Sequence, residues 1–222
     1  MLLVKEENKV VNNADQAENS LRHIAIGIVE QCADLDIDYL TLYAFSSENW
    51  NRPVEEVNDL MGLLKIYLTK EIAELHRKNI RISFIGSRER LSKNIISLID
   101  DAEEKTRNND KLRLTLALNY GGQEEIVCAA KNIAKKVQEG VLDIESIDDK
   151  TFSDNLYTGD MPEPDLIIRT SGEKRLSNFM LWQAAYAEFV FQDVLWPDFT
   201  RESLLSAIDE YHRRDRRYGA RP

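Results

Sequence analysis

The sequence predicts an α/β fold in one domain, with a mostly parallel sheet flanked by helices. Short apolar runs rich in β-branched and aromatic residues alternate with longer amphipathic stretches, which is the pattern of parallel strands joined by helices. No linker rich in Pro, Gly or Ser divides the 222 residues. The hydrophobic content of 43% and the charged content of 31% are ordinary for a globular protein that buries a proper core.

Five of the apolar runs are predicted as strands because they are short and contain mainly Val, Ile, Leu, Tyr and Phe. In chain order these strands are Tyr39–Phe45, Ile80–Ile85, Leu112–Leu118, Asp165–Arg169 and Phe189–Leu195.

The amphipathic stretches between the strands are predicted as helices. In Val54–Lys78 the apolar residues recur in steps of three and four, which indicates one long helix with a buried face. Further helices are predicted over Leu21–Leu35, Leu91–Arg107, Gln123–Glu139, Lys150–Tyr157, Asn178–Tyr186 and Arg201–Arg216.

The net charge of −10 argues against a general nucleic-acid-binding protein, since binding to a phosphate backbone requires a basic face. A site for an anion must therefore be local. No apolar run approaches the length of a membrane span, and Met1 to Ser20 lacks the apolar core of a signal peptide. The two cysteines, Cys32 and Cys128, are predicted to be free thiols. We expect a cytoplasmic protein, and peripheral contact with a membrane is compatible with that location.

The segment Pro164–Phe179 carries the clearest chemistry. An apolar strand runs into a turn with two arginines, three hydroxyl groups and a glycine, and an apolar stretch predicted as a helix follows. Arg169 and Arg175 supply planar charged groups that match phosphate oxygens, and Ser177 adds a smaller donor. Backbone N–H groups at a helix N-terminus also attract anions. The segment suits a diphosphate; the alternative is that Ser171 caps the helix while the arginines form surface ion pairs.

Two more polar segments directly follow predicted strands. Ser46–Pro53 follows the first strand and Asn119–Gly122 follows the third. In open α/β sheets, ligands bind beyond the carboxyl ends of the strands, so these segments and the arginine-containing turn are expected to share one edge of the sheet. The alternative is that their Asn, Ser and Gly residues only form turns.

Four segments of the chain together resemble the cis-prenyltransferases of the undecaprenyl diphosphate synthase family. They are Tyr43–Pro53, Ala117–Gly122, Ile168–Trp182 and Leu195–Phe199, and the resemblance extends from about Leu21 to Gly219. It implies a sheet flanked by helices around a hydrophobic tunnel, and a homodimer. It also implies Mg²⁺-dependent condensation of isopentenyl diphosphate with an allylic diphosphate such as farnesyl diphosphate. The product would be a cis-polyprenyl diphosphate, a lipid carrier of the undecaprenyl type.

The resemblance also assigns the site residues. Asn49 matches the position implicated in removing the proton, although an amide is a poor base and more plausibly orients the group that takes it. Glu188 matches a carboxylate that contributes to Mg²⁺ binding. The substrate-contacting positions are Ser46, Ser47, Glu48, Trp50 and Arg52 after the first strand, Arg169, Arg175, Leu176 and Ser177 for isopentenyl diphosphate, and Arg217 and Gly219, which reach the partner's active site.

The implied tunnel has candidate lining residues on the predicted strands. They are Tyr43, Phe84, Leu116 and Leu118, which are equally suitable as ordinary core residues.

One family motif is absent from the sequence. The family's first strand is followed by a loop that reads D-G-N-G-R-W-A, which supplies an aspartate for Mg²⁺ and donors for the allylic diphosphate. Here the corresponding region begins M-L-L-V-K-E-E-N. The first strand and loop are therefore missing or replaced, with Met1–Val4 as a candidate replacement strand. An altered start site or a truncation explains the difference equally well. At another position that can ligate metal in the family, this sequence has Lys174, whose side chain cannot bind a cation while it is protonated.

This difference leaves two readings of the domain and the activity. We divide the chain into an atypical N-terminal segment, residues 1–20, for which disorder is the alternative to a replacement strand, and a cis-prenyltransferase-like domain over residues 21–222. The first functional reading is an active cis-prenyltransferase. The alternative is an impaired or non-catalytic subunit that forms a heterodimer with a complete synthase, or a truncated synthase.

Overall fold

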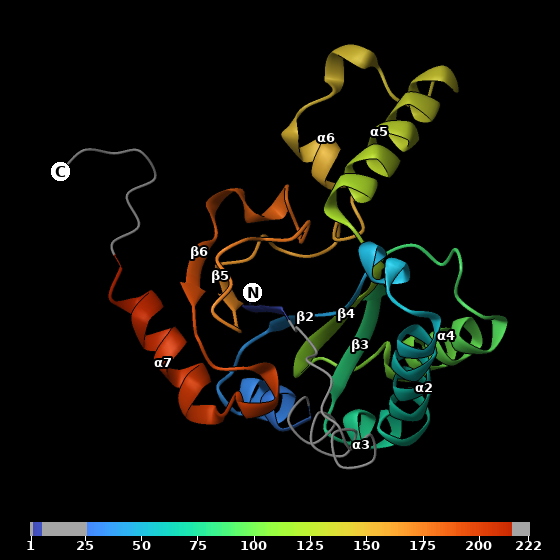
Figure 1. The fold of residues 1–222 in the computed structure, drawn as a ribbon. Coiled ribbons are helices and arrows are strands. Elements are labelled where there is room, and N and C mark those ends of the chain that lie inside the picture. The colour runs from blue at the N-terminus through green and yellow to red at the C-terminus, as the bar shows by residue number, and fades with distance from the viewer. Residues whose placement is uncertain (1, 6–25, 215–222) are drawn as a thin grey trace.

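The computed structural model describes residues 2–5 and 26–214, and these form one six-stranded sheet with helices packed against it (Figure 1). The strand order is β3-β4-β2-β1-β5-β6, and every neighbouring pair is parallel. The predicted fold class is confirmed. The strands are β1 Leu2–Lys5, β2 Tyr39–Ser46, β3 Ile80–Ile85, β4 Leu112–Tyr120, β5 Leu166–Arg169 and β6 Glu188–Phe191.

Strand β1 lies in the interior of the sheet. It pairs with β2 on one side, where Leu2 is level with Leu40, and with β5 on the other, where Leu2 is level with Leu166. A strand is therefore present at Leu2–Lys5, where Met1–Val4 was the candidate replacement strand. Residues 6–25, which follow this strand in the sequence, are outside the described part of the chain, so the division at residue 20 stays a prediction.

Most of the predicted helices are found, with bounds that differ by a few residues. The observed α-helices are the one over residues 26–34, α2 Val54–Lys70, α3 Ile72–Arg77, α4 Lys93–Thr106, α5 Gly122–Gln138, α6 Asp149–Ser153 and α7 Arg201–His212. Short 3₁₀ helices are η1 Ser47–Asn51, η2 Ile144–Ser146, η3 Gln183–Tyr186 and η4 Trp196–Asp198.

Four predicted segments were wrong in extent or type. The single helix Val54–Lys78 is two helices that break at Glu71, because the apolar spacing continues across the break and does not reveal it. The helix expected to reach Tyr157 ends at Ser153. The last strand ends at Phe191, because Gln192 and Val194 pair with the turn after β5. The helix predicted over Asn178–Tyr186 is mostly a series of turns.

The two faces of the sheet differ in what covers them. On one face, which we call the helix-covered face, Leu40, Leu42, Leu114, Leu116 and Ile168 pack under α2, α4, α7 and the helix over residues 26–34. We call the other face the loop-covered face: its apolar side chains meet residues from the segment after β5 rather than a helix. Helices α5 and α6 project away from the body of the protein (Figure 1).

The predicted tunnel residues are divided between these two faces. Leu116 and Leu118 lie in the core of the helix-covered face, with Phe84 packed against it, whereas Tyr43 lies in the core of the loop-covered face. These four side chains therefore cannot line one tunnel together, because the sheet separates Tyr43 from the other three.

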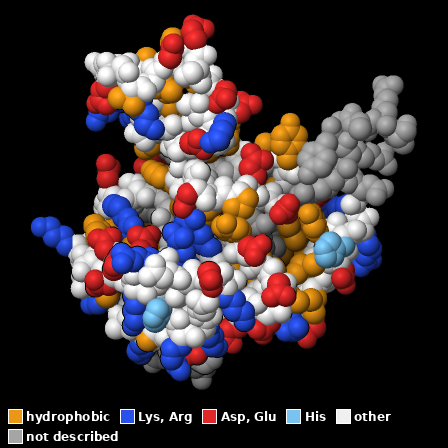
Figure 2. Space-filling view, turned by 180° about the vertical axis from the view of Figure 1, so that it is seen from behind, with side chains coloured by type: hydrophobic (Ala, Val, Ile, Leu, Met, Phe, Trp, Pro, Cys, Tyr) orange, Lys and Arg blue, Asp and Glu red, His pale blue; other side chains and the backbone are white. Residues whose placement is uncertain are grey.

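The two cysteines are free, as predicted. Cys32 lies in the core, where burial raises the pKa of its thiol to about 12. None of the helices in the described ranges is long and apolar enough to cross a membrane. Figure 2 shows acidic and basic side chains intermingled over the face it presents.

Candidate active site

The loops that follow β2, β4 and β5 meet at the carboxyl edge of the sheet, as predicted. Gly121, in the loop after β4, lies at the centre of this contact. A Cβ atom at Gly121 would lie 2.6 Å from Ser47 Oγ, after β2, and 2.8 Å from Asn178 Nδ2, after β5. Only a residue without a side chain allows both loops to come so close.

The loop after β2 is closed by Asn49. The Asn49 side-chain oxygen accepts a hydrogen bond from the backbone N–H of Ser46 at 2.8 Å, at the start of the 3₁₀ helix η1. That oxygen is thereby committed to holding the turn, and the amide nitrogen is the end of the side chain that remains to meet a substrate. The geometry agrees with an orienting role for Asn49 rather than that of a base.

Trp50 and Arg52 are also engaged within the protein. The indole N–H of Trp50 donates to Asn119 Oδ1 at 2.7 Å, and the ring lies 4.5 Å from the guanidinium carbon of Arg90. Arg52 pairs with Glu56 at 2.6 Å. Trp50 therefore ties the loop after β2 to the end of β4, a role that the sequence alone did not indicate.

The segment after β5 was predicted to begin a helix, and this was wrong. Ser171, Ser177, Asn178 and Met180 all have positive φ values, between 44° and 69°, which no α-helix accommodates. The chain turns inward so that Phe179 is fully buried and its ring stacks on the ring of Tyr43 with centroids 4.3 Å apart. The donors available to an anion here are thus side chains and loop N–H groups, not a helix N-terminus.

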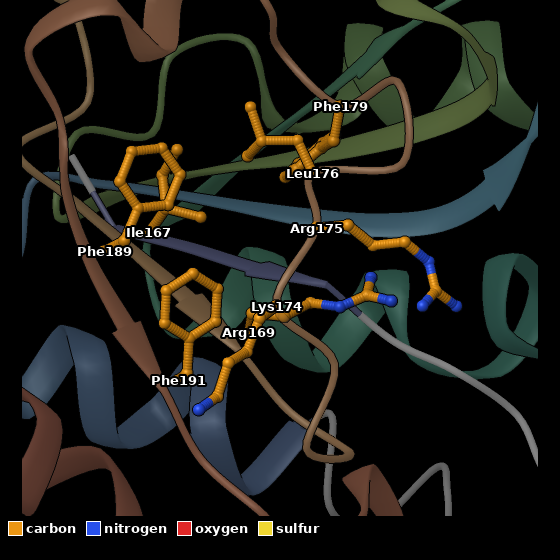
Figure 3. A pocket seen from close by; sticks show the side chains of 8 residues that line it. All are labelled: Ile167, Arg169, Lys174, Arg175, Leu176, Phe179, Phe189 and Phe191. Atoms are coloured by element: carbon orange, nitrogen blue, oxygen red, sulfur yellow. The ribbon is translucent and has the colours of Figure 1, made fainter.

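The predicted diphosphate-binding arginines line one cavity of about 260 Å³. Arg169 ends β5 and is only 2% exposed, whereas Arg175 is exposed and pairs with Glu173. In Figure 3 their guanidinium groups extend to the same side, and Phe189 and Phe191 lie on the other. The full lining is Ile167, Arg169, Lys174, Arg175, Leu176, Phe179, Phe189 and Phe191.

The cavity thus has two chemically different parts. Three cationic side chains lie beside apolar and aromatic ones, so an occupant with an anionic head and a hydrocarbon tail would satisfy both. Leu176, predicted to contact substrate, is among the residues that line this cavity. Ser177 follows directly in a left-handed conformation with a φ of 48°.

Glu188, the predicted metal ligand, is not brought to this cavity. It begins β6 level with Leu166, three residues before the level of Arg169, which corresponds to about 10 Å along the strands. Its carboxylate lies 2.8 Å from the guanidinium of Arg214, two residues after the end of α7. Because α7 packs on the helix-covered face, Glu188 is directed away from the arginines.

Within residues 2–5 and 26–214, no three or more His, Cys, Asp or Glu side chains gather in a way that could hold a metal ion. Lys174, which lines the cavity, is a cation itself. The described residues by themselves therefore supply no full set of protein ligands for Mg²⁺, an ion that usually binds through one or two carboxylates together with substrate phosphates. Arg217 and Gly219, predicted to reach a partner's site, lie outside the described residues.

A buried polar network is centred on Glu125, and the sequence analysis did not predict it. Glu125, in the first turn of α5, is 1% exposed. Its carboxylate accepts hydrogen bonds from the hydroxyl of Tyr120 at 2.5 Å, the backbone N–H of Tyr157 at 2.9 Å and the amide of Gln183 at 3.1 Å. Burial raises the pKa of Glu125 above its ordinary value, although these hydrogen bonds act in the opposite direction.

Comparison with known proteins gives a consistent family. The family model described as putative undecaprenyl diphosphate synthase matches residues 10–219. An isoprenyl transferase of Agrobacterium fabrum is 54% identical over 192 residues, which cover 86% of this chain and 78% of that protein. An isoprenyl transferase of Clostridium tetani is 50% identical over 192 residues, which cover 86% of this chain and 75% of that protein.

Two solved structures are similar over nearly the whole chain. The first is lavandulyl diphosphate synthase from Lavandula x intermedia in complex with dimethylallyl diphosphate. It has a TM-score of 0.90 and 34% sequence identity, and the match covers 98% of this chain and 97% of that chain. The second is a probable undecaprenyl diphosphate synthase from Campylobacter jejuni, with a TM-score of 0.84, 31% identity and the same coverage of 98% and 97%.

Proposed function

Because the chain belongs to the undecaprenyl diphosphate synthase family, we propose that it condenses isopentenyl diphosphate with an allylic diphosphate such as farnesyl diphosphate. By family the chain is an isoprenyl transferase. The proposed product is a cis-polyprenyl diphosphate that serves as a lipid carrier of the undecaprenyl type.

The observation that carries this proposal is the two-part cavity after β5. Arg169 and Arg175 offer positive charge at one side, and Phe189 and Phe191 offer an apolar wall at the other (Figure 3). Guanidinium groups match diphosphate oxygens in a two-pronged geometry, and the apolar wall suits the hydrocarbon part of isopentenyl diphosphate. A phosphate-binding site without a lipid-like ligand would have no need of this wall.

In the proposed reaction, the carbon–carbon bond forms between C4 of isopentenyl diphosphate and C1 of the allylic substrate. The bond from C1 to oxygen breaks, and the diphosphate leaves with the electron pair. A proton is then lost from C2 of the isopentenyl unit as the new double bond forms. Arg169, Arg175 and Ser177 would hold the isopentenyl diphosphate group, and Asn49 would orient the oxygen that takes the proton.

The remaining site residues have supporting assignments. Ser46, Ser47, Glu48, Trp50 and Arg52 would shape the loop beside Asn49, with Trp50 acting through Asn119. We also propose a homodimer in which Arg217 and Gly219 reach the partner's site. Mg²⁺, with Glu188 as one ligand, is proposed from family resemblance alone, because the described residues gather no set of metal ligands.

A second candidate function is that of an impaired or non-catalytic subunit of a heteromeric synthase. The observation that favours it is that Glu188 is paired with Arg214 in the described part of the chain, together with the absence of D-G-N-G-R-W-A from these 222 residues. Such a subunit would bind isopentenyl diphosphate, yet form product only when mixed with a complete synthase.

The test is direct. The purified chain is incubated with farnesyl diphosphate, labelled isopentenyl diphosphate and Mg²⁺, and the products are resolved by chain length. Polyprenyl product from the chain alone supports the first function, and its loss with EDTA supports the metal. Product that appears only after a complete synthase is added supports the second function. A folded chain that neither binds isopentenyl diphosphate nor forms product in either setting would overturn both.

A further inference from the structure

Asn178 joins the loops on either side of the candidate active site. Its side-chain oxygen accepts from the backbone N–H of Gln123 at 2.8 Å, and its side-chain nitrogen donates to Glu48 Oε1 at 2.7 Å. Its backbone oxygen also accepts from the N–H of Gly122 at 2.7 Å. One residue is therefore bonded to the loop after β2 and to the first turn of α5.

The positions of these partners in the chain give the contact its meaning. Asn178 directly follows Ser177, in the segment proposed to hold isopentenyl diphosphate, and Glu48 directly precedes Asn49. The side-chain bond from Asn178 to Glu48 therefore links the two loops directly, with Gly121 packed between them.

Two local features suit Asn178 to this contact. Its φ of 61° lies in the left-handed region, which asparagine tolerates better than most residues. Burial acts to raise the pKa of Glu48, but hydrogen bonds, first among them the one from Asn178, hold it below its ordinary value. The partner is therefore a carboxylate, and a charge-assisted bond of this kind is stronger than one between neutral groups.

We propose that Asn178 is a positioning residue that sets the spacing between the isopentenyl diphosphate loop and the Asn49 loop. This inference rests on the proposed condensation reaction. Its effect is on the geometry of two bound substrates rather than on the binding of either one, because the arginines that hold the diphosphate are separate side chains. Misplacement of reacting groups by about 1 Å can cost about 100-fold in rate.

The test is Asn178→Asp, which keeps the size, the tolerance of positive φ and an oxygen for Gln123, but removes the donor and places two carboxylates together. We expect kcat to fall about 100-fold, while the Kd for isopentenyl diphosphate alone, measured by calorimetry, changes less than about threefold. Adding Glu48→Gln restores a donor on the other side of the pair. The double variant should recover at least about tenfold of the lost kcat.

Asn79→Asp is the matched control. Asn79 also has a positive φ, of 60°, and its amide nitrogen also donates to a carboxylate, that of Asp110 at 2.5 Å, but it lies before β3 at the far edge of the sheet. The Asn79→Asp variant should have the same kcat as wild type.

Three results would overturn the inference. The first is an Asn178→Asp variant whose kcat equals that of wild type. The second is an equal loss of kcat in the Asn178→Asp and Asn79→Asp variants, and the third is a double variant with a lower kcat than Asn178→Asp. A wild-type chain that forms no product would instead remove the proposed function, and this inference with it.

Discussion

The replacement of Glu125 by Gln tests the buried network under the site. Glu125 accepts hydrogen bonds from three donors: the Tyr120 hydroxyl, the Tyr157 backbone N–H and the Gln183 side-chain NH₂. The two nitrogen groups present hydrogen atoms to Glu125 and cannot accept a hydrogen bond from it. A Gln at this position has one oxygen, so its NH₂ group must face one of those donors. Leaving a buried donor unpaired costs about 1–3 kcal/mol. We expect the free energy of unfolding to fall by that amount, as measured with denaturant.

The same variant should also change how the free energy of unfolding depends on pH. Because burial raises the pKa of Glu125 in the folded protein, the folded state binds more protons than the unfolded state between the ordinary value of 4.5 and the raised value. The stability contributed by Glu125 is therefore largest below pH 4.5 and falls as the pH rises through that window. Glu125→Gln lacks this slope. The reasoning would be refuted if Glu125→Gln lowered the free energy of unfolding by less than about 0.5 kcal/mol. It would also be refuted if the difference in that free energy between wild type and variant grew as the pH rises.

Three further changes have expected outcomes. Arg169→Met keeps the apolar stem but removes a charged donor, so calorimetry should show isopentenyl diphosphate binding about 10- to 100-fold more weakly. Gly122→Ala places a Cβ 2.9 Å from Leu181 Cγ and 3.1 Å from the Asn178 oxygen, so kcat and the melting temperature should both fall. Ser92→Ala removes the N-cap of α4, where Ser92 accepts from the Ile95 N–H at 3.3 Å, and should cost about 1 kcal/mol in denaturant unfolding.

Each of these predictions has a contradicting result. Unchanged affinity after Arg169→Met would remove this arginine from the diphosphate site. A fully active Gly122→Ala would show that the loop contact yields without cost. A Ser92→Ala variant as stable as wild type would mean that solvent replaces the cap.

The regular part of the fold was predictable because its signals are local. The bounds of α4 and α5 differ from the predicted ranges by only one or two residues, since their apolar spacing ends where their helices end. The meeting of the loops after β2 and β4 was also predictable, because parallel neighbouring strands bring their carboxyl ends to one edge. Arg169 and Arg175 were expected at this edge for the same reason, since one ends β5 and the other lies in the turn that follows, and both line the cavity there.

The irregular part was not predictable, because it depends on contacts between distant segments. The turns after β5 exist because Phe179 stacks on Tyr43, and no local pattern encodes that contact. Asn178 resembled a helix residue in sequence, yet its left-handed conformation bonds it to Glu48. The pair Gly121-Gly122 was the available signal, since two adjacent glycines after a buried strand mark a place where other backbone approaches closely.

The measurement that tests the central claim most directly is calorimetric titration of the purified chain with isopentenyl diphosphate, followed by condensation with farnesyl diphosphate in the same preparation. The account predicts saturable binding that Arg169→Met weakens, and polyprenyl product that depends on the same cavity. Wild-type binding that is unchanged by both Arg169→Met and Arg175→Met would contradict the placement of the isopentenyl diphosphate site after β5.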